Sequence, residues 1–308
     1  MLFLPACAAL LLALLLPAAG LHPSPGLQAD PHPGQVYRPL VSRLSREGFA
    51  GEQVRDLLLG AGTAFYPEVV RLHLARAEKE SPYRSMDNPR AVAAVRAFLR
   101  ENDEAFQAAY RTYGVDPATV AALLYVESRF GKNTGDRPVL YVLSSVSLAD
   151  EPWLLQRMAG ELDQRHPGLS EVEREELSGW IADRARTRAS WAFRELVALL
   201  TMAEREGTNI RELRGSWAGA FGIPQFLPSS FLRYGVDGDG DGVIDLYTLE
   251  DAVASVSHYL AEKGWDASSH LHRRTALWEY NNSWYYVDLI EKLAEAAGGS
   301  EGAEAFAR

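Results

Sequence analysis

The stretch Gly114–Gly131, with the sequence GVDPATVAALLYVESRFG, predicts a helix that is marked at both ends. Asp116 is a good N-cap, and Pro117 suits the first helical position because its ring already holds a helical φ angle. Gly131 supplies a stop signal. We therefore expect a well-defined helix near the middle of the chain, around which the other segments are organised.

Glu127 occupies an unusual position in this predicted helix. At 100° per residue, one side carries Glu127 together with three apolar residues, Val120, Leu123 and Leu124, while Arg129 lies roughly opposite. Burial in an apolar stripe and the negative end of the helix dipole both raise the pKa of a carboxyl group. A carboxyl group that keeps its proton near neutral pH is what a general acid needs. The alternatives are a glutamate paired with a buried arginine, or one turned out to solvent by fraying of the helix end.

Length, composition and charge narrow the class of protein. The 308 residues suffice for one large domain or two modest ones, and 47% hydrophobic and 23% charged residues are ordinary for a globular protein. The net charge of −10 argues against a dedicated nucleic-acid binder, which usually carries a basic face. It also argues against adhesion to anionic lipid surfaces as the main role.

The N-terminal region predicts an exported protein. Residues 2–20, LFLPACAALLLALLLPAAG, form an apolar run without a charged side chain, which indicates a signal peptide of residues 1–20 that is cleaved after Gly20. An uncleaved N-terminal membrane anchor is the alternative. Residues 21–35 are rich in proline and suit an exposed linker.

Cys7 is the only cysteine, and it lies too early in the apolar run to look like a lipoprotein attachment site. A chain cleaved after Gly20 would contain no cysteine. The mature protein would then have no disulfide, no thiol catalysis and no thiolate metal site. Export without disulfides fits a bacterial periplasm or envelope at least as well as a eukaryotic exterior.

Beyond the linker the pattern is helical almost throughout, so the predicted fold is mostly α with at most a very small β element. Residues 170–206 fit one long helix or a broken pair, opened by a capping box at Ser170 and Glu173. Residues 139–148 fit a helix or a buried strand, and we favour the helix. Residues 215–242, rich in glycine and proline, are expected to form a structured loop. The other expected helices span residues 52–60, 67–80, 89–113, 249–263, 273–280 and 283–297, and a frayed tail follows at 298–308.

The sharpest local signal is the acidic stretch Asp237–Asp245, DGDGDGVID. Its alternating acids, with glycine at the sixth position, match the front half of an EF-hand loop, where oxygen ligands on a tight turn suit Ca²⁺. Position 12 is Thr248 instead of glutamate, so the closing carboxylate has to come from Asp251 or Glu250. A solvated acidic turn, with Asp251 only capping the next helix, is the alternative. The other expected ligands of a structural calcium ion in this EF-hand-like loop (residues 237–251) are Asp237, Asp239, Asp241 and the main-chain carbonyl of Val243.

Aromatic residues are the most informative of the remaining patterns. The sequence contains no phosphate-binding glycine-rich signature, no GxSxG elbow and no zinc-type HExxH spacing. YNNSWYY (Tyr280–Tyr286) combines four rings with three polar side chains, and Trp217, Phe221 and Phe226 lie in the glycine- and proline-rich segment. Flat ring faces beside amide and hydroxyl groups are expected in a sugar-binding groove. The alternative is that these rings are simply core residues.

Four motifs together resemble the membrane-bound lytic murein transglycosylase B family. The run GVDPATVAALLYVESRFGKNTG is similar to the catalytic-helix region of that family, and SWAGAFGIPQFLPSS is similar to its SWAGAxGxxQFxPSS segment. The acidic loop followed by DAVASVSHYLAEKGW continues the similarity, and YNNSWYY matches the C-terminal Tyr-Asn-x-Ser-x-x-Tyr pattern. The motifs occur in the family order between Val115 and Leu289, whereas the first hundred residues add little.

The resemblance implies a lysozyme-like, mostly helical transglycosylase domain over residues 36–297, with a helical N-terminal subdomain. It implies a periplasmic lyase that cleaves the glycan strands of peptidoglycan between N-acetylmuramic acid and N-acetylglucosamine. Glu127 would be the sole catalytic residue, first as the acid that protonates the glycosidic oxygen. As base it would then help the muramyl C6 hydroxyl attack C1 and leave a 1,6-anhydro end. The nucleophile then belongs to the substrate, unlike in the two-carboxylate scheme of most glycosidases.

The resemblance also implies which residues bind the substrate and the metal. Carried over by motif, the sugar-binding residues are Ser216, Gln225, Tyr280 and Tyr286, with Tyr259 as a further candidate. Arg188 matches a family arginine, although its neighbours differ. Phe130 and Phe231 replace a tryptophan and a tyrosine that are frequent in the family. The late acid of the family's calcium loop favours Asp251 over Glu250 as the closing ligand.

Two other functions are alternatives to a lytic transglycosylase. A hydrolytic muramidase would need a second carboxylate, about 5 Å from Glu127 for retention or about 6.5–9.5 Å for inversion, and no partner stands out in the sequence. A non-catalytic peptidoglycan-binding scaffold is the other, because a fold does not determine a function. The expected partner is the peptidoglycan glycan strand, with no nucleic acid, no organic cofactor, and membrane contact only through an uncleaved N-terminal segment.

Overall fold

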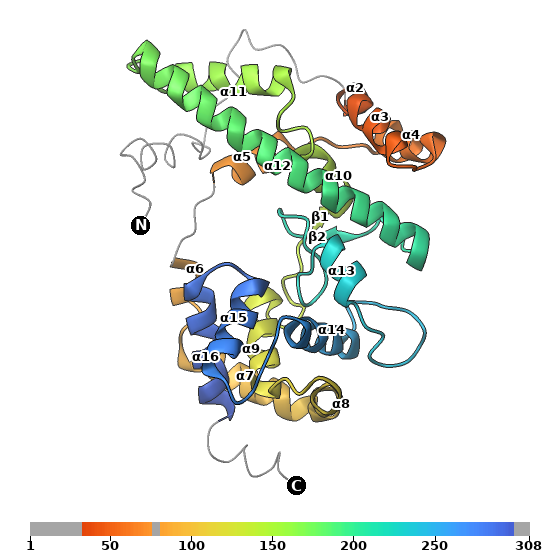
Figure 1. Ribbon diagram of the computed structural model, residues 1–308, viewed down its shortest axis with the longest axis vertical. Coiled ribbons are helices and arrows are strands. Elements are labelled where there is room, and N and C mark those ends of the chain that lie inside the picture. The colour runs from red at the N-terminus through yellow and green to blue at the C-terminus, as the bar shows by residue number, and fades with distance from the viewer. Residues whose placement is uncertain (1–32, 76–80, 299–308) are drawn as a thin grey trace. The chain divides into compact units, whose positions relative to one another are not determined.

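The computed structural model of this chain describes residues 33–75 and 81–298 (Figure 1). The predicted signal peptide, residues 21–32 of the predicted linker and the tail from residue 299 lie outside the described residues. Helix α2 (Pro33–Val36) begins inside the last residues of the predicted linker. Val36 and the following Tyr37 are buried, which explains why the chain is already part of the folded structure here.

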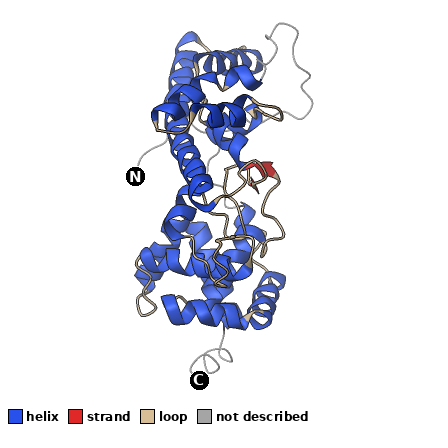
Figure 2. Ribbon diagram, turned by 90° about the vertical axis from the view of Figure 1, so that its right-hand side faces the viewer, coloured by secondary structure: helices blue, strands red, loops and turns tan. Residues whose placement is uncertain are grey.

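The described residues belong to two compact units. The first unit contains the chain up to Ala77, Arg137–Leu213 and Trp217–Gly219, and the second contains Glu78–Asp136, Arg214–Ser216 and the chain from Ala220 onward. Almost all of the regular structure is helical (Figure 2). The strands β1 (Arg137–Pro138) and β2 (Arg214–Gly215) have two residues each, so the β structure of the described residues is very small. The predicted fold class, mostly α with a very small β element, is confirmed.

Four helices build the core of the first unit: α5 (Pro67–Ala75), α10 (Val139–Val146), α11 (Pro152–Arg165) and α12 (Glu171–Glu206). Small residues on α12, among them Ala185, Ala189 and Ala192, are buried in this cluster and let the neighbouring helices approach closely. The helices α3 (Arg38–Arg46) and α4 (Gly51–Leu59) also belong to this unit.

Two alternatives that the sequence left open are decided in the first unit. Residues 139–146 are helical, and all eight are buried, so their apolar run belongs to an enclosed helix and not to a strand. Helix α12 is continuous over 36 residues. Its capping box is present, because Ser170 Oγ accepts from Glu173 N at 3.3 Å while the Glu173 carboxylate accepts from Ser170 N at 2.9 Å.

Helix α9 (Pro117–Ser128) is the centre of the second unit, where it packs against α7, α8, α14 and α16 (Figure 1). The other helices of this unit are α6 (Ser81–Arg84), α7 (Pro89–Glu101), α8 (Asp103–Tyr113), α13 (Pro228–Tyr234), α14 (Leu249–Glu262), α15 (His270–Tyr280) and α16 (Trp284–Gly298).

Helix α9 begins where the sequence predicts it, but residues on all of its sides are buried. Asp116 caps it through a bond from Thr119 N at 2.9 Å. The apolar residues predicted beside Glu127, namely Val120, Leu123 and Leu124, are buried, but so is every other residue of 117–126, so burial is not confined to one side. Neighbouring helices surround it. The helix ends at Ser128, so Arg129 lies beyond it in a left-handed conformation with φ of 51°, and not on an opposite helical face.

Two other helix predictions in the second unit are corrected. The expected single helix 89–113 is two helices, because the chain breaks at Asn102, whose side chain bonds back to Phe98 O at 2.8 Å. The expected loop 215–242 contains helix α13, which begins at Pro228 and buries Phe231 and Tyr234 three residues apart. The sequence prediction also did not include α3 and α11.

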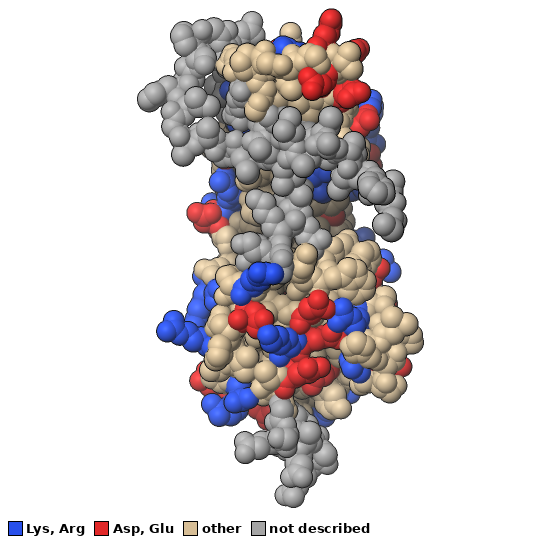
Figure 3. Space-filling view, turned by 90° about the vertical axis from the view of Figure 1, so that its left-hand side faces the viewer, with Lys and Arg blue, Asp and Glu red and all other residues tan. Residues whose placement is uncertain are grey.

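On the face drawn in Figure 3, acidic and basic side chains are intermixed. Ion pairs of this kind join α15 to α16, where Arg274 lies 2.7 Å from Asp288, and α16 to the turn before α7, where Lys292 lies 2.6 Å from Asp87. None of the helices within residues 33–75 and 81–298 combines the length and the apolar character that crossing a membrane requires.

Candidate active site around Glu127

Glu127 lies on the last turn of α9 and accepts a hydrogen bond from a tyrosine on another helix. The hydroxyl of Tyr286, on α16, donates to Glu127 Oε1 at 2.8 Å. The residue is partly exposed, but its carboxyl group is surrounded by protein atoms, and this desolvation raises the pKa of Glu127 from 4.5 to about 7. The bond from Tyr286 stabilises the carboxylate and lowers the pKa by a smaller amount. The predicted raised pKa is confirmed, with enclosure by helices as its cause.

Tyr286 is held in place by the start of α16. Ser283, which is 3% exposed, accepts a bond from Tyr286 N at 3.2 Å through its hydroxyl, and its carbonyl accepts from Val287 N at 3.1 Å. Ser283 therefore acts as the N-cap of α16. Burial, followed by the negative charge of Glu127, raises the pKa of Tyr286 well above its usual value. Its hydroxyl thus keeps its proton and is a donor to Glu127 across the pH range in which the carboxyl group titrates.

Two further tyrosines extend this cluster. The ring of Tyr280 stacks on that of Tyr286 with a centroid distance of 6.4 Å and an interplanar angle of 8°, and Tyr259 meets Tyr280 edge to face at 4.8 Å. Main-chain carbonyls hold both hydroxyls, since Tyr280 donates to Pro224 O at 2.6 Å and Tyr259 donates to Glu279 O at 2.7 Å. The structure therefore brings all three predicted tyrosines into one cluster, in which Tyr286 contacts the carboxyl group and the buried Tyr259 contacts Tyr280.

The glycine- and proline-rich segment 215–227 folds into a tight turn next to the end of α9. Phe221 pairs in antiparallel fashion with both Gly215 and Phe226. Gly222 has a φ of 75°, and a β-carbon there would lie 2.5 Å from Leu246 Cβ, so the close approach requires glycine. The main chain of the next residue, Ile223, links Leu246 to Ser128. Ile223 N donates to Leu246 O at 2.8 Å, and Ile223 O accepts from the hydroxyl of Ser128 at 2.7 Å.

The predicted sugar-binding residues of this segment also hold the turn together. Gln225 has a left-handed φ of 53°, and its Nε2 donates to Gly222 O at 2.8 Å and to Thr134 O at 3.0 Å. It directly follows the proline whose carbonyl binds the tyrosine cluster. Ser216 Oγ accepts from Ala220 N at 3.3 Å at the other end of the turn. Both side chains thus have a structural function in addition to any contact with a ligand.

Arg188 belongs to the first unit, whereas the tyrosine cluster belongs to the second. It lies on α12, one helical turn from Arg184. Desolvation, followed by the like charge of Arg188, lowers the pKa of Arg184. The predicted role of Arg188 in sugar binding stays a prediction.

Several side chains around the site were not predicted from sequence. Tyr83, on α6, meets Tyr286 edge to face at a centroid distance of 6.2 Å. Phe98, on α7, stacks on Phe130 at 3.8 Å with an interplanar angle of 6°. These contacts join residues far apart in the chain, and no local pattern marks them. Ser283 had a local signal, because a serine just before an apolar helical pattern is a typical N-cap.

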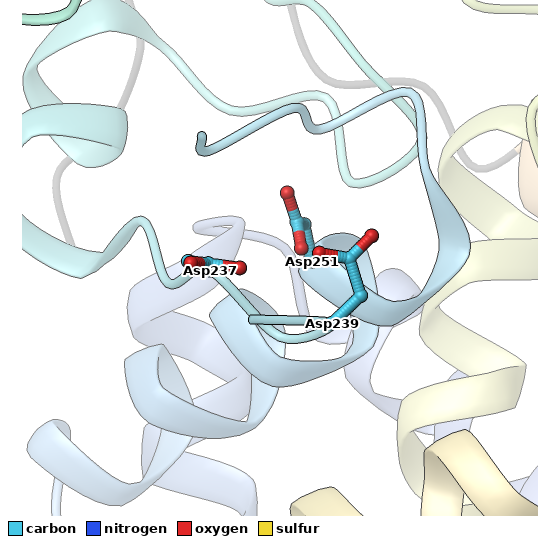
Figure 4. Close-up of side chains that lie close together, drawn as sticks. All are labelled: Asp237, Asp239 and Asp251. Atoms are coloured by element: carbon cyan, nitrogen blue, oxygen red, sulfur yellow. The ribbon is translucent and has the colours of Figure 1, made fainter. Parts of the chain in front are cut away.

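The acidic loop brings three of its predicted ligands together. Carboxylate oxygens of Asp237, Asp239 and Asp251 lie within 4.8 Å of one another. Figure 4 shows Asp237 and Asp239 on the loop and Asp251 on the helix that follows, α14. Asp251 is 1% exposed and also holds the loop closed, because it accepts bonds from Gly238 N at 2.7 Å and Asp245 N at 2.6 Å.

The other predicted ligands are outside this group of three. The Asp241 carboxylate accepts a bond from Val243 N at 2.8 Å, and Val243 itself is exposed. Hydrogen bonds, first of all from Gly242 N, lower the pKa of Asp237. The bond from Asp241 N also lowers the pKa of Asp239, but desolvation and the charges of Asp241, Asp251 and Asp237 outweigh it and raise that pKa. Concentrated negative charge of this kind suits an oxygen-ligated divalent cation.

Comparisons with known proteins agree with this fold. The chain matches the Transglycosylase SLT domain over residues 34–277. It is 30% identical over 168 residues to membrane-bound lytic murein transglycosylase B of Escherichia coli (strain K12), an alignment that covers 54% of this chain and 37% of the E. coli protein. The chain therefore spans little more than a third of the length of the E. coli protein that it matches.

Solved structures show the same fold at lower identity. The E. coli lytic transglycosylase Slt35, in complex with calcium, is similar with a TM-score of 0.66 and 20% identity, covering 91% of this chain and 95% of that one. SltB3 from Pseudomonas aeruginosa, in complex with NAG-anhNAM-pentapeptide, is similar with a TM-score of 0.66 and 21% identity, covering 88% of this chain and 81% of that one.

Fold and site define a mostly helical, lysozyme-like protein with a desolvated, protonatable carboxyl group at the end of its central helix. This chain belongs to the family of the Transglycosylase SLT domain.

Proposed function

We propose that this protein is a peptidoglycan lytic transglycosylase. It cleaves the β-1,4 bond between N-acetylmuramic acid and N-acetylglucosamine without water and leaves 1,6-anhydromuramyl ends. The observation that carries the proposal is Glu127, a carboxyl group with a pKa of about 7 that is bonded to Tyr286. Membership of the Transglycosylase SLT domain family supports the same activity, as does the relative SltB3, which binds a NAG-anhNAM-pentapeptide.

Glu127 acts first as general acid. With a pKa of about 7, a large share of the molecules hold the proton at neutral pH, and this proton passes to the glycosidic oxygen as the bond to C1 breaks. Positive charge develops at the sugar ring, and the carboxylate left behind stabilises it. The hydroxyl of Tyr286 donates to that carboxylate and keeps it oriented.

Glu127 then acts as general base. The carboxylate takes the proton of the muramyl C6 hydroxyl while that oxygen bonds to C1, which closes the 1,6-anhydro ring and restores the protonated acid. A pKa near neutrality suits both half-reactions, because neither protonation state is strongly disfavoured. The muramidase alternative differs in needing a second carboxylate, about 5 Å from the acid for retention or about 6.5–9.5 Å for inversion.

The remaining polar and aromatic residues bind the glycan strand. The ring of Tyr280 is half-buried next to that of Tyr286 and is suited to the apolar face of a sugar, whereas the Tyr286 ring is only 1% exposed. Gln225 and Ser216 supply amide and hydroxyl groups from the adjoining turn. Tyr259 supports the cluster from behind, and Arg188 belongs to the same proposed set.

The acidic loop holds a structural calcium ion. The carboxylates of Asp237, Asp239 and Asp251 are already close together, and oxygen donors of this type fit Ca²⁺. Asp241 and the carbonyl of Val243 complete the proposed ligand set. The related Slt35 has been seen in complex with calcium, which supports the assignment. The ion when bound neutralises the crowded carboxylates, and no catalytic step passes through it.

The protein acts in the cell envelope after export. The apolar residues 2–20 are the export signal, and the matched E. coli protein is membrane-bound by its name. Peptidoglycan is the partner expected there.

Digestion of purified sacculi tests the activity directly. The wild-type protein and Glu127→Gln are incubated with sacculi, and the released muropeptides are analysed by mass spectrometry. We expect 1,6-anhydro ends from the wild type and a loss of about 10²–10⁴-fold in release for Glu127→Gln, the range that a general acid contributes.

The products distinguish the three functions. Reducing ends, which carry one added water, would show a muramidase. No release by the wild type, together with retained binding to sacculi, would show a scaffold. Circular dichroism of both proteins serves as the folding control.

A further inference from the structure

The residue after the proposed acid has a hydroxyl with two main-chain partners. Ser128 is 1% exposed, and its Oγ donates to Ile223 O at 2.7 Å while it accepts from Gly131 N at 2.8 Å. The first bond joins α9 to the turn of segment 215–227, and the second closes the turn that follows α9. Neither bond is needed to form the helix itself, whose last turn is already bonded to the main chain of Leu124 and Tyr125.

The turn after α9 is in a conformation that needs outside support. Arg129, Phe130 and Gly131 are three consecutive residues with positive φ, at 51°, 59° and 83°. Residues other than glycine adopt this region only where surrounding contacts impose it. The hydroxyl of Ser128 is such a contact, because it binds the third residue of this turn and anchors it to Ile223. Gly131 also lies close to that side chain, with its β-carbon position 3.2 Å from Ile223 Cγ1.

The contacts form a closed circuit around the carboxyl group. Ser128 binds Ile223, and the next residue, Pro224, accepts from Tyr280 at 2.6 Å. Tyr280 stacks on Tyr286, whose hydroxyl returns to Glu127 at 2.8 Å. Because Ser128 directly follows Glu127 in the chain, a shift of its main chain moves the carboxyl group.

We infer that Ser128 is a positioning residue, which holds the Glu127 carboxyl group against the Tyr286 hydroxyl by fixing the end of α9 to the turn at Ile223. The expected effect of Ser128 on catalysis rests on the proposed function. Its effect on the position of the carboxyl group rests on geometry alone. Ser128 touches no substrate. Its loss therefore acts on the chemical step and on the protonation of Glu127, and leaves substrate affinity unchanged.

Removal of the hydroxyl is tested with Ser128→Ala. The variant leaves the carbonyl of Ile223 and the amide of Gly131 unpaired, so the turn loosens and the carboxyl group loses its fixed place. We expect kcat to fall by about tenfold or more, since small displacements of a catalytic group have large effects, with KM within twofold of the wild type. Ser128→Thr keeps a hydroxyl at the same position and is expected to restore kcat to within about threefold.

The pKa of Glu127 gives a readout that does not depend on activity. Selective ¹³C labelling of glutamate carboxyl groups allows its titration by NMR, with Glu127→Gln identifying the signal. Loosening admits water to the carboxyl group and reduces the desolvation that raises its pKa. We expect the Glu127 pKa to move down from about 7 in Ser128→Ala and to stay at about 7 in Ser128→Thr.

A matched control separates positioning from loss of stability. Ser257 is also 1% exposed and also donates to a main-chain carbonyl, Val253 O at 2.8 Å, but this bond lies within α14 and joins it to no other element. Ser257→Ala is expected to lower the melting temperature without changing the Glu127 pKa or kcat of the folded protein.

The inference is overturned if Ser128→Ala keeps the wild-type Glu127 pKa, whatever happens to its activity. It is also overturned if Ser128→Ala loses activity only in proportion to folded protein, as Ser257→Ala does. If the wild type releases no anhydromuropeptides, the proposed function fails, whereas the NMR titration of Glu127 still tests the role of Ser128.

Discussion

Glu127 and Tyr286 carry the proposed chemistry at the scale of single residues. Enclosure of the carboxyl group raises its pKa to about 7, and the tyrosine hydroxyl opposes this rise by stabilising the carboxylate. The two effects have different chemical meaning. Desolvation keeps the proton available for the proposed acid step. The hydrogen bond prevents the pKa from rising so far that the carboxyl group becomes a weak proton donor.

Replacing Tyr286 by phenylalanine tests this balance. The hydrogen bond lowers the pKa of Glu127, so Tyr286→Phe is expected to raise it above about 7 and to move the alkaline limb of the pH–rate profile to higher pH. Because bonds to a charged group contribute about 1.5–3 kcal/mol, kcat at neutral pH should fall by roughly 10- to 100-fold. The measurement is release of muropeptides from sacculi across pH 5–9.

Tyr285→Phe is the control for this variant, because Tyr285 is adjacent in sequence but 45% exposed. Tyr285→Phe should change neither the alkaline limb of the pH–rate profile nor kcat. A limb that moves to lower pH in Tyr286→Phe would contradict the assigned effect of the hydroxyl.

At the scale of elements, the acidic loop and the turn of segment 215–227 are joined. Asp251 closes the loop through Asp245 N, and the next residue, Leu246, accepts from Ile223 N at 2.8 Å. Tyr247 also donates to Arg214 O at the start of that turn. A loop that is held by a cation therefore stabilises the element that packs on the end of α9.

Calcium is expected to raise the melting temperature of the wild type. A ligand at 100 times its dissociation constant stabilises by about 2.7 kcal/mol, which for a chain of this size corresponds to a rise of roughly 5 °C. Differential scanning calorimetry with EGTA and with added Ca²⁺ measures the shift. Asp251→Asn should abolish most of it, because this buried carboxylate lies in the group of three.

Glu250→Gln is the matched control, since Glu250 is the neighbouring acid and lies outside the group of three carboxylates. It should keep the calcium-dependent shift. An equal loss in both variants would show that total charge, and not the geometry of Asp251, holds the ion. No shift in the wild type would mean that the loop is a solvated acidic turn.

At the scale of the whole molecule, the site costs stability. The second unit assembles the carboxyl group of Glu127 from the centre of the fold, with partners from segment 215–227 and from α16. Burying a carboxylate is unfavourable, so the native state prefers the protonated form more strongly than the unfolded chain does. The same enclosure that suits catalysis therefore reduces stability at high pH.

Glu127→Gln is expected to become more stable than the wild type as pH rises. The folded pKa is about 7 and the unfolded value is 4.5, so the native protein binds more protons between them. The contribution of Glu127 to the free energy of unfolding is greatest below pH 4.5. It is lost as pH rises through 7, by at most about 3 kcal/mol before solvent screening. Glutamine does not titrate and avoids this loss. Urea unfolding at pH 4.5 and pH 8 measures the difference, and an equal effect of the substitution at both values would contradict it.

Local patterns allowed much of this fold and site to be predicted. The caps at Asp116 and Ser170, the capping box and most helix bounds depend on interactions between near neighbours, so they are visible in a sequence. The helix break at Asn102 and helix α13 were not predicted, because a continuous apolar period and a run rich in glycine and proline hid them. The partners of the tyrosines could not be predicted, because they come from segments far apart in the chain.

The sequence by itself determined the helical class, the identity of the proposed acid and the acidic loop, because residue type and spacing are local properties. Only the tertiary structure decided why Glu127 holds its proton. An apolar stripe was the expected cause, but α9 is buried on every side, and enclosure by other helices removes water from the carboxyl group. The tertiary structure also brought Tyr286 to that group and joined Ser128 to Ile223, since hydrogen bonds across 159 and 95 residues exist only once the chain has folded.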